Sequence, residues 1–467
     1  MNKKSSYLLG KTVLFMGFFL SFSACKKSVI ADPAPSDNFK QIQVDAATGS
    51  GSDVMMQAFY WDVPQGGWWN TLNDKIPAWK AAGIGAIWLP PATKAQGGAT
   101  SMGYDPYDYF DFGSYTQMGT KPTRFGDSTS LGKLITTAHN NSIKVYADIV
   151  LNHCSGGTLE ANPYTNTSTY TKFTPLSGKF QRTYNDFHPN DIEAADEGAF
   201  AGFPDLCHKK ANVSNWIYNA SYSMSKFYKN NLHFDGFRFD YVKGYGAWVV
   251  KNFVNSVGGP AAVFAVGEEW DGNAANLQNW VDATEQTSSA FDFACFYAMH
   301  SAFDTNDLTR LNDDMLLKRN AAKAVTFVSN HDTDITTNKY SAYAYIMTHE
   351  GYPCVFYKDY ENLLDKNRMN NLIWIHKNLA GGTTTNLYSA TDQYIDRRNG
   401  YGTLPGLIVY FNGSDNWQQQ WVTSNWANKK IKEYTGASNW EPTVAADGRV
   451  LIQVPPHAYS IWSVTGL

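Results

Sequence analysis

Three carboxylate residues close short apolar runs at the same relative position. Asp240 ends "FDGFRFD", Glu268 ends "VFAVGE" and Asp332 ends "TFVSNHD". Arg238 lies two residues before Asp240, so in an extended strand both side chains point to one face and the flanking phenylalanines point to the other. Taken alone, Arg238 and Asp240 fit a structural ion pair equally well. The recurrence of acids after several apolar runs is what indicates a functional cluster.

A cluster of carboxylates without an evident catalytic serine or cysteine motif favours glycoside hydrolysis. In that reaction one carboxylate attacks the anomeric carbon, while a second, kept protonated by its surroundings, gives a proton to the leaving oxygen. We expect Arg238 to keep Asp240 ionised, as a nucleophile must be. The apolar strand before Glu268 is a setting that raises the pKa of a carboxyl group towards the working pH.

The elements that would position these acids follow an alternating pattern. Eight short apolar runs predict strands, and most are followed by helical periodicity, which indicates an α/β fold of the (β/α)8 TIM-barrel type. The predicted strands are 54–59, 86–89, 144–148, 234–240, 263–267, 290–293, 324–328 and 353–356, and predicted helices include 72–82, 130–140, 216–229 and 248–257. The carboxyl ends of the strands meet at one mouth of such a barrel, where active sites of this fold lie.

Two segments do not follow the barrel pattern. Residues 153–213, after the third strand, are rich in Asn, Thr, Gly and Pro and predict an inserted, loop-rich domain B, since loops of this length are normally functional or small domains. Residues 381–467 alternate apolar and polar side chains between turn signals, which predicts a C-terminal antiparallel β-sandwich. The barrel would then comprise residues 53–152 and 214–380.

The N-terminus has the pattern of an export signal. Two lysines are followed by an apolar stretch at 7–22, then by two small residues and Cys25. Residues 1–25 therefore resemble a bacterial lipoprotein signal, in which Cys25 is lipidated and becomes the mature N-terminus. Phe22 stands where that motif usually has Leu, and the alternative is ordinary secretion with Cys25 incidental. Residues 26–52 predict a flexible tether. We therefore expect an exported protein attached to the bacterial outer membrane only through Cys25, on its periplasmic or surface face, or otherwise a secreted one.

Composition limits the partners. The chain has 38 Lys+Arg against 42 Asp+Glu, so nothing indicates an electrostatic grip on nucleic acid. Aromatic residues make up 15%, with 15 Trp and 28 Tyr, which suits sugar rings as well as apolar cores.

Four segments in order, "DIVLNH", "GFRFDYVKG", "AVGEEW" and "FVSNHD", resemble the signature regions of glycoside hydrolase family 13, the α-amylase family. "FPDLC" resembles a further region of that family in domain B, and "SMGYDPYDYFDFG" is similar to the calcium-dependent α-amylases of hyperthermophilic archaea. The resemblance implies an endo-acting, retaining hydrolase of internal α-1,4-glucosidic bonds in starch. Its expected partners are starch and α-glucan oligosaccharides, and we expect it to be a monomer. Alternatives are a glucanotransferase or an α-1,6-acting relative, and, in another class, a starch-binding lipoprotein without catalysis.

The resemblance also assigns roles by position. Asp240 would be the nucleophile, Glu268 the acid/base and Asp332 the transition-state stabiliser. Substrate contacts would come from six residues: Tyr104, His153, Arg238, Lys243, Trp270 and His331. For Tyr104 the alternative is barrel packing alone. Glu269 stands where these amylases usually have Tyr, and if it faces the mouth, its charge would raise the pKa of Glu268.

Two metal sites are implied as well. A structural Ca2+ would be held by Asn152, Asp196, Asp205 and the backbone oxygens near Gly198 and Gly244, an all-oxygen set that suits a hard cation. A second ion, Zn2+, would use His188, Glu193 and Cys207, with Glu193 in place of a histidine. His188 as an ordinary loop histidine and a Cys154–Cys207 disulfide are the alternatives there. Cys295 and Cys354 are expected to be small buried hydrophobes.

Overall fold

The structure is a computed structural model that describes residues 53–467. The signal predicted for residues 1–25, with Cys25, and the tether predicted for 26–52 lie outside the described residues. Within residues 53–467, no helix is both long and apolar enough to cross a membrane.

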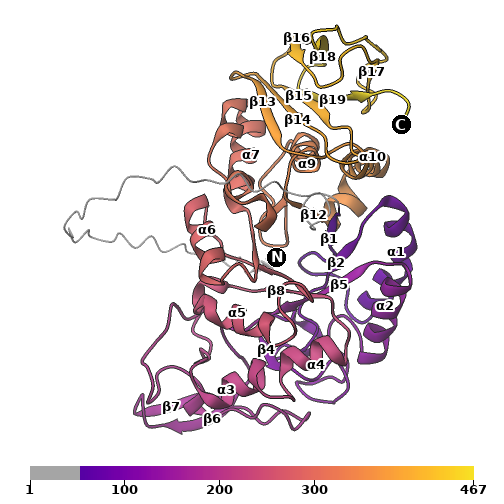
Figure 1. Ribbon diagram of the computed structural model, residues 1–467. Helices are drawn as coiled ribbons and strands as arrows, with labels where there is room; N and C mark the ends of the chain where they lie inside the picture. The colour runs from indigo at the N-terminus through magenta and orange to yellow at the C-terminus, as the bar shows by residue number, and fades with distance from the viewer. Residues whose placement is uncertain (1–52) are drawn as a thin grey trace, which may run out of the picture. The chain divides into compact units, whose positions relative to one another are not determined.

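Eight parallel strands close into a barrel (Figure 1). They are β1 (Met55–Gln57), β2 (Ala86–Trp88), β5 (Lys144–Ile149), β8 (Gly236–Phe239), β9 (Phe264–Gly267), β10 (Ser289–Phe291), β11 (Ala324–Phe327) and β12 (Tyr352–Phe356). Their order around the barrel is β1-β12-β11-β10-β9-β8-β5-β2. All eight coincide with predicted strands, so the (β/α)8 barrel is confirmed.

Helices connect the barrel strands and cover the barrel (Figure 1). They are α1 (Trp68–Ala82), α2 (Ser128–Asn140), α4 (Met224–Asn230), α5 (Ala247–Asn255), α6 (Ala274–Ala283), α7 (Phe293–Thr305), α8 (Leu316–Arg319), α9 (Lys339–Thr348) and α10 (Lys366–Asn378). The strand predicted at 290–293 ends earlier, at Phe291, because the side chain of Asp292 accepts a hydrogen bond from Cys295 N at 2.9 Å and starts α7.

The single helix predicted for 216–229 is wrong. The structure has a π-helical turn at Asn215–Asn219, an interruption, and then α4 from Met224. Lys226 stabilises the interruption, because its Nζ donates to the carbonyl oxygens of Tyr218, Asn219 and Ala220 at 3.1, 2.8 and 2.8 Å. A lysine side chain thus satisfies the carbonyls that a continuous helix would have paired internally.

The segment predicted as domain B is mostly irregular. Its regular elements are a hairpin, β6 (Thr158–Asn162) and β7 (Thr167–Lys172), and the short α3 (Ala211–Ser214), and a second small pair, β3 (Lys94–Ala95) and β4 (Pro106–Asp108), precedes α2. Backbone hydrogen bonds join the segment to the barrel ends: Leu206 N donates to Asn152 O at 2.9 Å, and Gly198 N donates to Gly244 O at 3.1 Å. The segment therefore folds back onto the loops that follow β5 and β8.

The C-terminal residues form antiparallel sheets, as predicted. One sheet has the order β13 (Thr384–Ser389), β14 (Gln393–Arg398), β15 (Leu407–Asn412), β19 (Ala458–Val464), β17 (Ile431–Glu433), and the other pairs β16 (Gln418–Thr423) with β18 (Arg449–Val454). Phe411 of β15 packs on Phe303 of α7 and on Tyr345 of α9, with ring centroids 5.2 and 6.2 Å apart. Ile395, Ile408, Val422 and Ile452 belong to a separate core between the two sheets.

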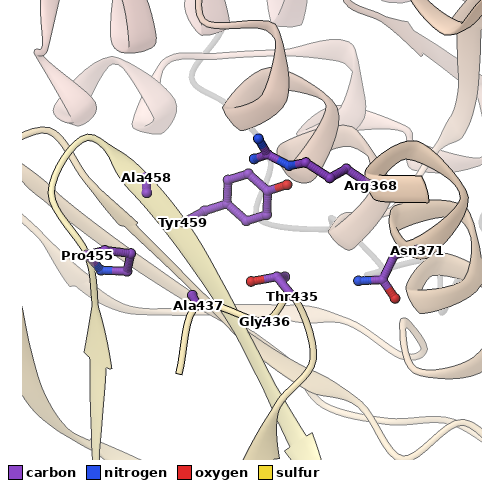
Figure 2. A pocket seen from close by; sticks show the side chains of 8 residues that line it. All are labelled: Arg368, Asn371, Thr435, Gly436, Ala437, Pro455, Ala458 and Tyr459. Carbon is purple, nitrogen blue, oxygen red and sulfur yellow. The ribbon is translucent and has the colours of Figure 1, made fainter. Parts of the chain in front are cut away.

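A surface pocket lies where α10 meets the C-terminal sheet (Figure 2). Its lining includes Arg368 and Asn371 of α10 and Tyr459 of β19. Because it contains none of the predicted site residues, this pocket is separate from the acidic cluster described next.

Candidate active site

Strand β8 carries the arginine and delivers the first acid. Phe237 and Phe239 point outward, where both rings pack edge-on against Phe253 of α5 at 5.0 and 5.2 Å. Arg238, between them, points to the barrel interior and is aligned with Asp148 of β5 and Val266 of β9. Apolar-outward alternation therefore places the guanidinium inside the barrel, next to the strand end where Asp240 follows.

Arg238 holds three carboxylates. Its Nη1 donates to Asp148 Oδ1 at 2.9 Å and to Asp240 Oδ1 at 2.7 Å, and its Nη2 lies 2.6 Å from Glu268 Oε1. The arginine is 1% exposed, so these charge-assisted contacts are shielded from water. Two of the three predicted catalytic acids thus meet on one guanidinium.

Asp148 is a part of this cluster for which the sequence pattern predicted no role. Its Oδ2 accepts hydrogen bonds from Trp88 Nε1 at 3.0 Å and Tyr104 OH at 2.8 Å, while its Oδ1 accepts from Arg238. It is buried, and a signal for it was present: an aspartate inside the apolar run "VYADIV" needs a partner. Asp148 therefore orients both Arg238 and Tyr104.

The third acid, Asp332, lies on a turn after β11. Asn330 Oδ1 accepts from the backbone N–H groups of Asp332 and Thr333 at 2.8 and 2.7 Å, which fixes the turn. His331 contacts Asp332 through its Nε2, 3.3 Å from Asp332 Oδ2, and Gln57 Nε2 donates to its Nδ1 at 2.9 Å. Burial, with the charge of Arg238, holds the pKa of His331 well below its usual value, so the ring is neutral and carries its hydrogen at Nε2.

The three acids differ in their electrostatic surroundings. Burial raises the pKa of Asp240, whereas Arg238 opposes the shift. Burial also raises the pKa of Glu268; Arg238 opposes this shift too, but the charge of Asp240 adds to the increase. Burial and then the charge of Glu268 raise the pKa of Asp332 to about 6. The arrangement therefore favours a protonated Glu268 beside an ionised Asp240.

Aromatic rings line one side of the acids. Tyr104 stacks on His331 with centroids 5.3 Å apart and an interplanar angle of 12°, and Trp61 stacks on Tyr104 at 6.0 Å. Trp61 is 48% exposed and follows β1; sequence reasoning missed it, because a single aromatic residue in a loop carries no positional signal. Tyr104 packs against the core and also donates to Asp148, while its contact with a sugar stays a prediction.

Lys243 and Trp270 lie on the other side. Lys243 Nζ donates to Trp270 O at 3.1 Å, and Trp270 Nε1 donates to Tyr297 OH at 3.0 Å. Burial raises the pKa of Glu269 to about 7, with Asp271 adding to the shift and Lys243 opposing it. The charge that raises the pKa of Glu268 is that of Asp240, so the structure offers a different source for the effect expected of Glu269.

His153 is buried against two phenylalanine rings whose centroids lie 6.3 Å from each other. Phe200 and Phe203 lie 5.0 and 5.1 Å from His153, nearly parallel to the imidazole. Its Nε2 donates to Tyr104 O at 2.8 Å, while its Nδ1 has no hydrogen-bond partner within the described part of the chain. His153 is thus connected to the aromatic side of the site through the backbone of Tyr104.

The oxygen atoms predicted to bind calcium lie close together. The side-chain amide of Asn152 lies 3.1 Å from Gly244 O and 3.2 Å from Gly198 O, and its NH₂ group can donate to both. Asp196 Oδ1 and Asp205 Oδ1 are both buried and lack a hydrogen-bond partner among residues 53–467. An oxygen-only donor set with two carboxylates fits Ca2+.

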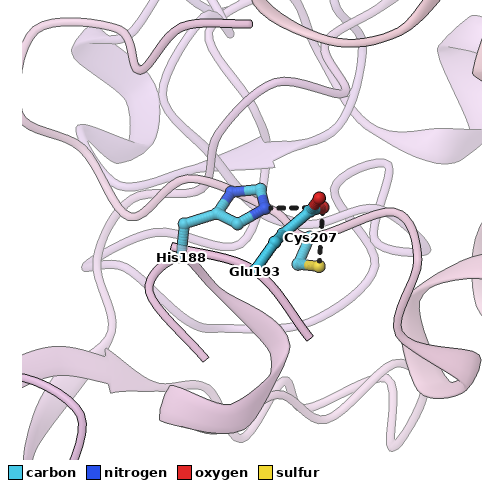
Figure 3. Close-up of side chains that lie close together, drawn as sticks. All are labelled: His188, Glu193 and Cys207. Carbon is cyan, nitrogen blue, oxygen red and sulfur yellow. Dashed lines mark hydrogen bonds and ion pairs between the residues drawn. The ribbon is translucent and has the colours of Figure 1, made fainter. Parts of the chain in front are cut away.

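A second cluster shares His188 with the first, and Figure 3 shows its three side chains, His188, Glu193 and Cys207. His188 Nδ1 lies 2.9 Å from Asp205 Oδ2, and its Nε2 lies 3.2 Å from Glu193 Oε1, which also accepts from Cys207 Sγ at 3.5 Å. The potential ligand atoms of His188, Glu193 and Cys207 lie within 4.8 Å of one another. Glu193 also pairs with Lys209, which competes for its second oxygen.

The cysteines are free throughout the described chain. Cys154 Sγ lies 3.6 Å from Tyr109 OH, whereas Cys207 Sγ faces Glu193, so the alternative of a Cys154–Cys207 disulfide is not realised in this structure. Cys295 and Cys354 are buried among apolar side chains, which confirms the prediction for both.

Three carboxylic acids around one arginine at the mouth of a (β/α)8 barrel define a glycoside hydrolase site. Residues 36–371 match the family described as "Alpha amylase, catalytic domain", and residues 407–463 match "Alpha-amylase C-terminal". Since the first match spans more than half of the chain, the chain belongs to the α-amylase family.

Individual relatives agree with this assignment. The chain is 27% identical over 487 residues to the "Cytoplasmic alpha-amylase" of Escherichia coli strain K12, covering 88% of this chain and 98% of that protein. It is 29% identical over 483 residues to the "Alpha-amylase" of Geobacillus stearothermophilus, covering 88% and 86%. The solved structure of a cyclomaltodextrin glucanotransferase with a three-domain ABC distribution superposes with a TM-score of 0.68 at 22% identity, covering 89% of this chain and 100% of that one, which supports the fold.

Proposed function

We propose that the chain hydrolyses internal α-1,4-glucosidic bonds of starch and related glucans by double displacement. The observation that carries the mechanism is the single guanidinium of Arg238 that contacts both Asp240 and Glu268. One guanidinium shared by two carboxylates favours a short separation, about 5–5.5 Å in retaining enzymes, over the about 6.5–9.5 Å of inverting ones.

In the first step Asp240 attacks the anomeric carbon and forms a glycosyl-enzyme ester, while the glycosidic C–O bond breaks. Glu268 gives its proton to the departing oxygen. In the second step Glu268 takes a proton from water, whose oxygen displaces Asp240 at the same carbon. The carboxylate of Asp332 stabilises the positive charge that develops on the sugar ring.

The remaining residues bind the sugars. Tyr104 and His331 form an aromatic side against which a sugar ring packs, and Arg238 contacts the acids directly. His153 contacts the sugar on the same side as Tyr104. Lys243 and Trp270 contact the sugar on the side of the leaving group.

Reducing-sugar release from soluble starch tests the activity, and single substitutions test the roles. Asp240→Asn should lower kcat by about 10⁴-fold or more with an unchanged melting curve. Glu268→Gln should be similarly impaired on starch, but should recover on aryl glycosides whose leaving group needs no proton. Near-normal turnover by Asp240→Asn would reject the assignment of the nucleophile.

Product analysis separates the alternatives. A hydrolase shortens maltoheptaose, whereas a glucanotransferase also produces chains longer than the substrate or cyclic products. Cleavage of pullulan at α-1,6 bonds would indicate an α-1,6-acting member of the family. Absence of any reducing-sugar release despite retention on starch would indicate a non-catalytic binding lipoprotein.

We further propose that Ca2+ links the inserted segment to the barrel. Asn152 and Gly244 belong to the loops after β5 and β8, while Asp196, Gly198 and Asp205 belong to the inserted segment. The unpaired oxygens of Asp196 and Asp205 are what support this site. A structural ion there would stabilise a segment with little regular structure of its own.

The second cluster is a proposed Zn2+ site, because His188, Glu193 and Cys207 offer nitrogen, oxygen and sulfur ligands. Elemental analysis of the purified protein tests both ions. Zinc present in the wild type and absent from Cys207→Ser supports the second site, and calcium without zinc in the wild type argues against it.

For location, we propose an exported lipoprotein anchored through Cys25 to the bacterial outer membrane. The support is the basic, apolar and small-residue order that ends at Cys25. The wild type should then partition into the detergent phase and Cys25→Ser into the aqueous phase. The same aqueous partition for both forms would indicate simple secretion.

A further inference from the structure

Strand β16 presents large side chains that the C-terminal core does not use. Exposure alternates from the residue before the strand onward: positions 417, 419, 421 and 423 are exposed, whereas Val422 is buried. Trp417 is 53% exposed and Trp421 is 64% exposed. With the rise of an antiparallel strand, two residues four positions apart on one face are separated by about 13 Å.

This face is held by its partner strand. β16 pairs with β18 along its whole length, so Gln419 lies opposite Gln453 and Trp421 lies opposite Leu451. On the reverse side, Val422 together with Val450, Ile452 and Val454 is buried in the C-terminal core. Trp421 therefore projects from a paired strand, and Trp417 projects from the residue directly before it.

The polar groups on the face are neutral amides in a defined orientation. Gln419 Nε2 donates to Gln453 Oε1 at 3.2 Å, and Gln453 Nε2 donates to Ser438 Oγ at 2.7 Å. The relay leaves the carbonyl oxygen and one N–H of Gln419 directed to solvent. Arg449, at the end of the face, is paired with Asp447 at 2.7 Å, so the centre of the face carries no charge.

We propose that this β16 face, made of Trp417, Gln419, Trp421 and Thr423 with Leu451 and Gln453, is a second binding surface for neutral glucan chains. It rests on the proposed function in that the ligand is the enzyme's own substrate. Sugar rings offer C–H faces that stack on indoles and hydroxyls that bond amides, and the face supplies both groups.

The chemistry of the face argues against other occupants. An anionic surface such as nucleic acid needs a cluster of basic residues, which the centre of this face lacks. A second copy of the chain would be expected to cover a more continuous apolar surface, whereas here amides lie between the tryptophans. Two exposed indoles on one fixed face still form a patch that marks a binding site.

The test is retardation of the full chain in native gels that contain amylopectin, with Asp240→Asn as background so that the polymer survives. The double substitution Trp417→Ala/Trp421→Ala should weaken retardation by about tenfold or more. Tyr388→Ala is the control, because Tyr388 is an exposed aromatic residue, 37% exposed, on β13 of the same C-terminal region. Gln419→Ala should weaken retardation less, without touching an aromatic residue.

A second measurement uses the chain with its acids intact. Hydrolysis of starch granules should fall in the tryptophan double variant, whereas hydrolysis of soluble maltoheptaose should stay within twofold of the wild type. Unchanged retardation overturns the proposal, and so does an equal loss on maltoheptaose, which would indicate an effect through the fold.

Sedimentation tests whether the β16 face instead binds a second copy of the chain. A wild-type dimer that the tryptophan substitutions convert to a monomer would show that the face binds a second copy of the chain, and the proposal would be wrong. If the chain hydrolyses no glucan but is still retarded through these tryptophans, the proposed function fails while this inference stands.

Discussion

Asp148→Asn probes the charge balance of the active site most directly. The substitution keeps the size of the side chain but removes the charge that faces Arg238. In the wild type, Asp148 Oδ1 accepts from Arg238 and its Oδ2 accepts from Trp88 and Tyr104. If the oxygen of the asparagine amide stays with Arg238, the amide NH₂ group faces the donors of Trp88 and Tyr104. If the amide turns over, the NH₂ group faces the guanidinium of Arg238 instead.

The magnitude follows from these contacts. Losing the two neutral hydrogen bonds costs about 1 kcal/mol each. Weakening the bond to Arg238, whose acceptor is no longer charged, costs about 1 kcal/mol more, so we expect a total loss of about 3 kcal/mol. If this loss falls on the geometry of the transition state, kcat/KM decreases about 10²-fold. Tyr104→Phe is the matched control, since it keeps the ring, removes one neutral donor to Asp148 and should cost about 1 kcal/mol, or roughly fivefold.

The pH profile gives a second and independent readout. Asp148 is the carboxylate that interacts most strongly with Arg238. Without its charge, the positive charge of Arg238 acts more fully on Glu268, whose pKa it already lowers. Glu268 must be protonated to act as the acid, so a lower pKa moves the basic limb of the profile to lower pH. Tyr104→Phe should leave that limb in place.

Steady-state kinetics on maltoheptaose between about pH 4 and 10 measure both effects, with a thermal melt to confirm folding. A variant within threefold of wild-type kcat/KM, with a superimposable pH profile, would refute the positioning role of Asp148. An activity loss without movement of the basic limb would show that Asp148 affects geometry but not the charge balance at Glu268.

The barrel could be predicted because each strand is a self-contained signal. A short apolar run bounded by turns, repeated eight times with helical periodicity between, leaves few alternatives to a closed parallel barrel. The errors arose where a side chain overrides local periodicity. Lys226 caps the carbonyls of an interrupted helix, and Asp292 ends β10 early by starting α7. Both effects depend on the direction of one polar side chain, which periodicity does not encode.

The site was predictable only in part, for a related reason. Acids that follow parallel strands converge by topology, so the strand pattern alone is enough to bring Arg238, Asp240 and Glu268 together. Asp148 is in register with Arg238 on the neighbouring strand, so topology brings it to the mouth as well, but the pattern gave it no role. Trp61 lies in a loop, where topology gives no direction. The proposed calcium ligands Asp196 and Asp205 lie in an aperiodic segment, and only resemblance to a family could pair them with Asn152.

Three further predictions follow from single contacts. Chelation of calcium should lower both melting temperature and activity, added Ca2+ should restore them, and Asn152→Ala should lose most of this response; a wild type indifferent to chelator would exclude the structural ion. Glu269→Gln should leave the basic limb of the pH profile where it is, because Asp240 rather than Glu269 raises the pKa of Glu268, and a downward movement of that limb would show that Glu269 does face the acid. The last concerns Lys94, which is fully buried and whose Nζ donates to the carbonyl oxygens of Thr120 and Lys121 at 2.9 and 2.6 Å and lies 3.7 Å from Asp111. Lys94→Met would leave those carbonyls and a buried carboxylate without their cation, so we expect a loss of about 3–5 kcal/mol in the free energy of unfolding. Lys121→Met, at an exposed position of the same loop, should change it by less than about 0.5 kcal/mol; equal losses in the two denaturant titrations would show that the buried ammonium does not organise this loop.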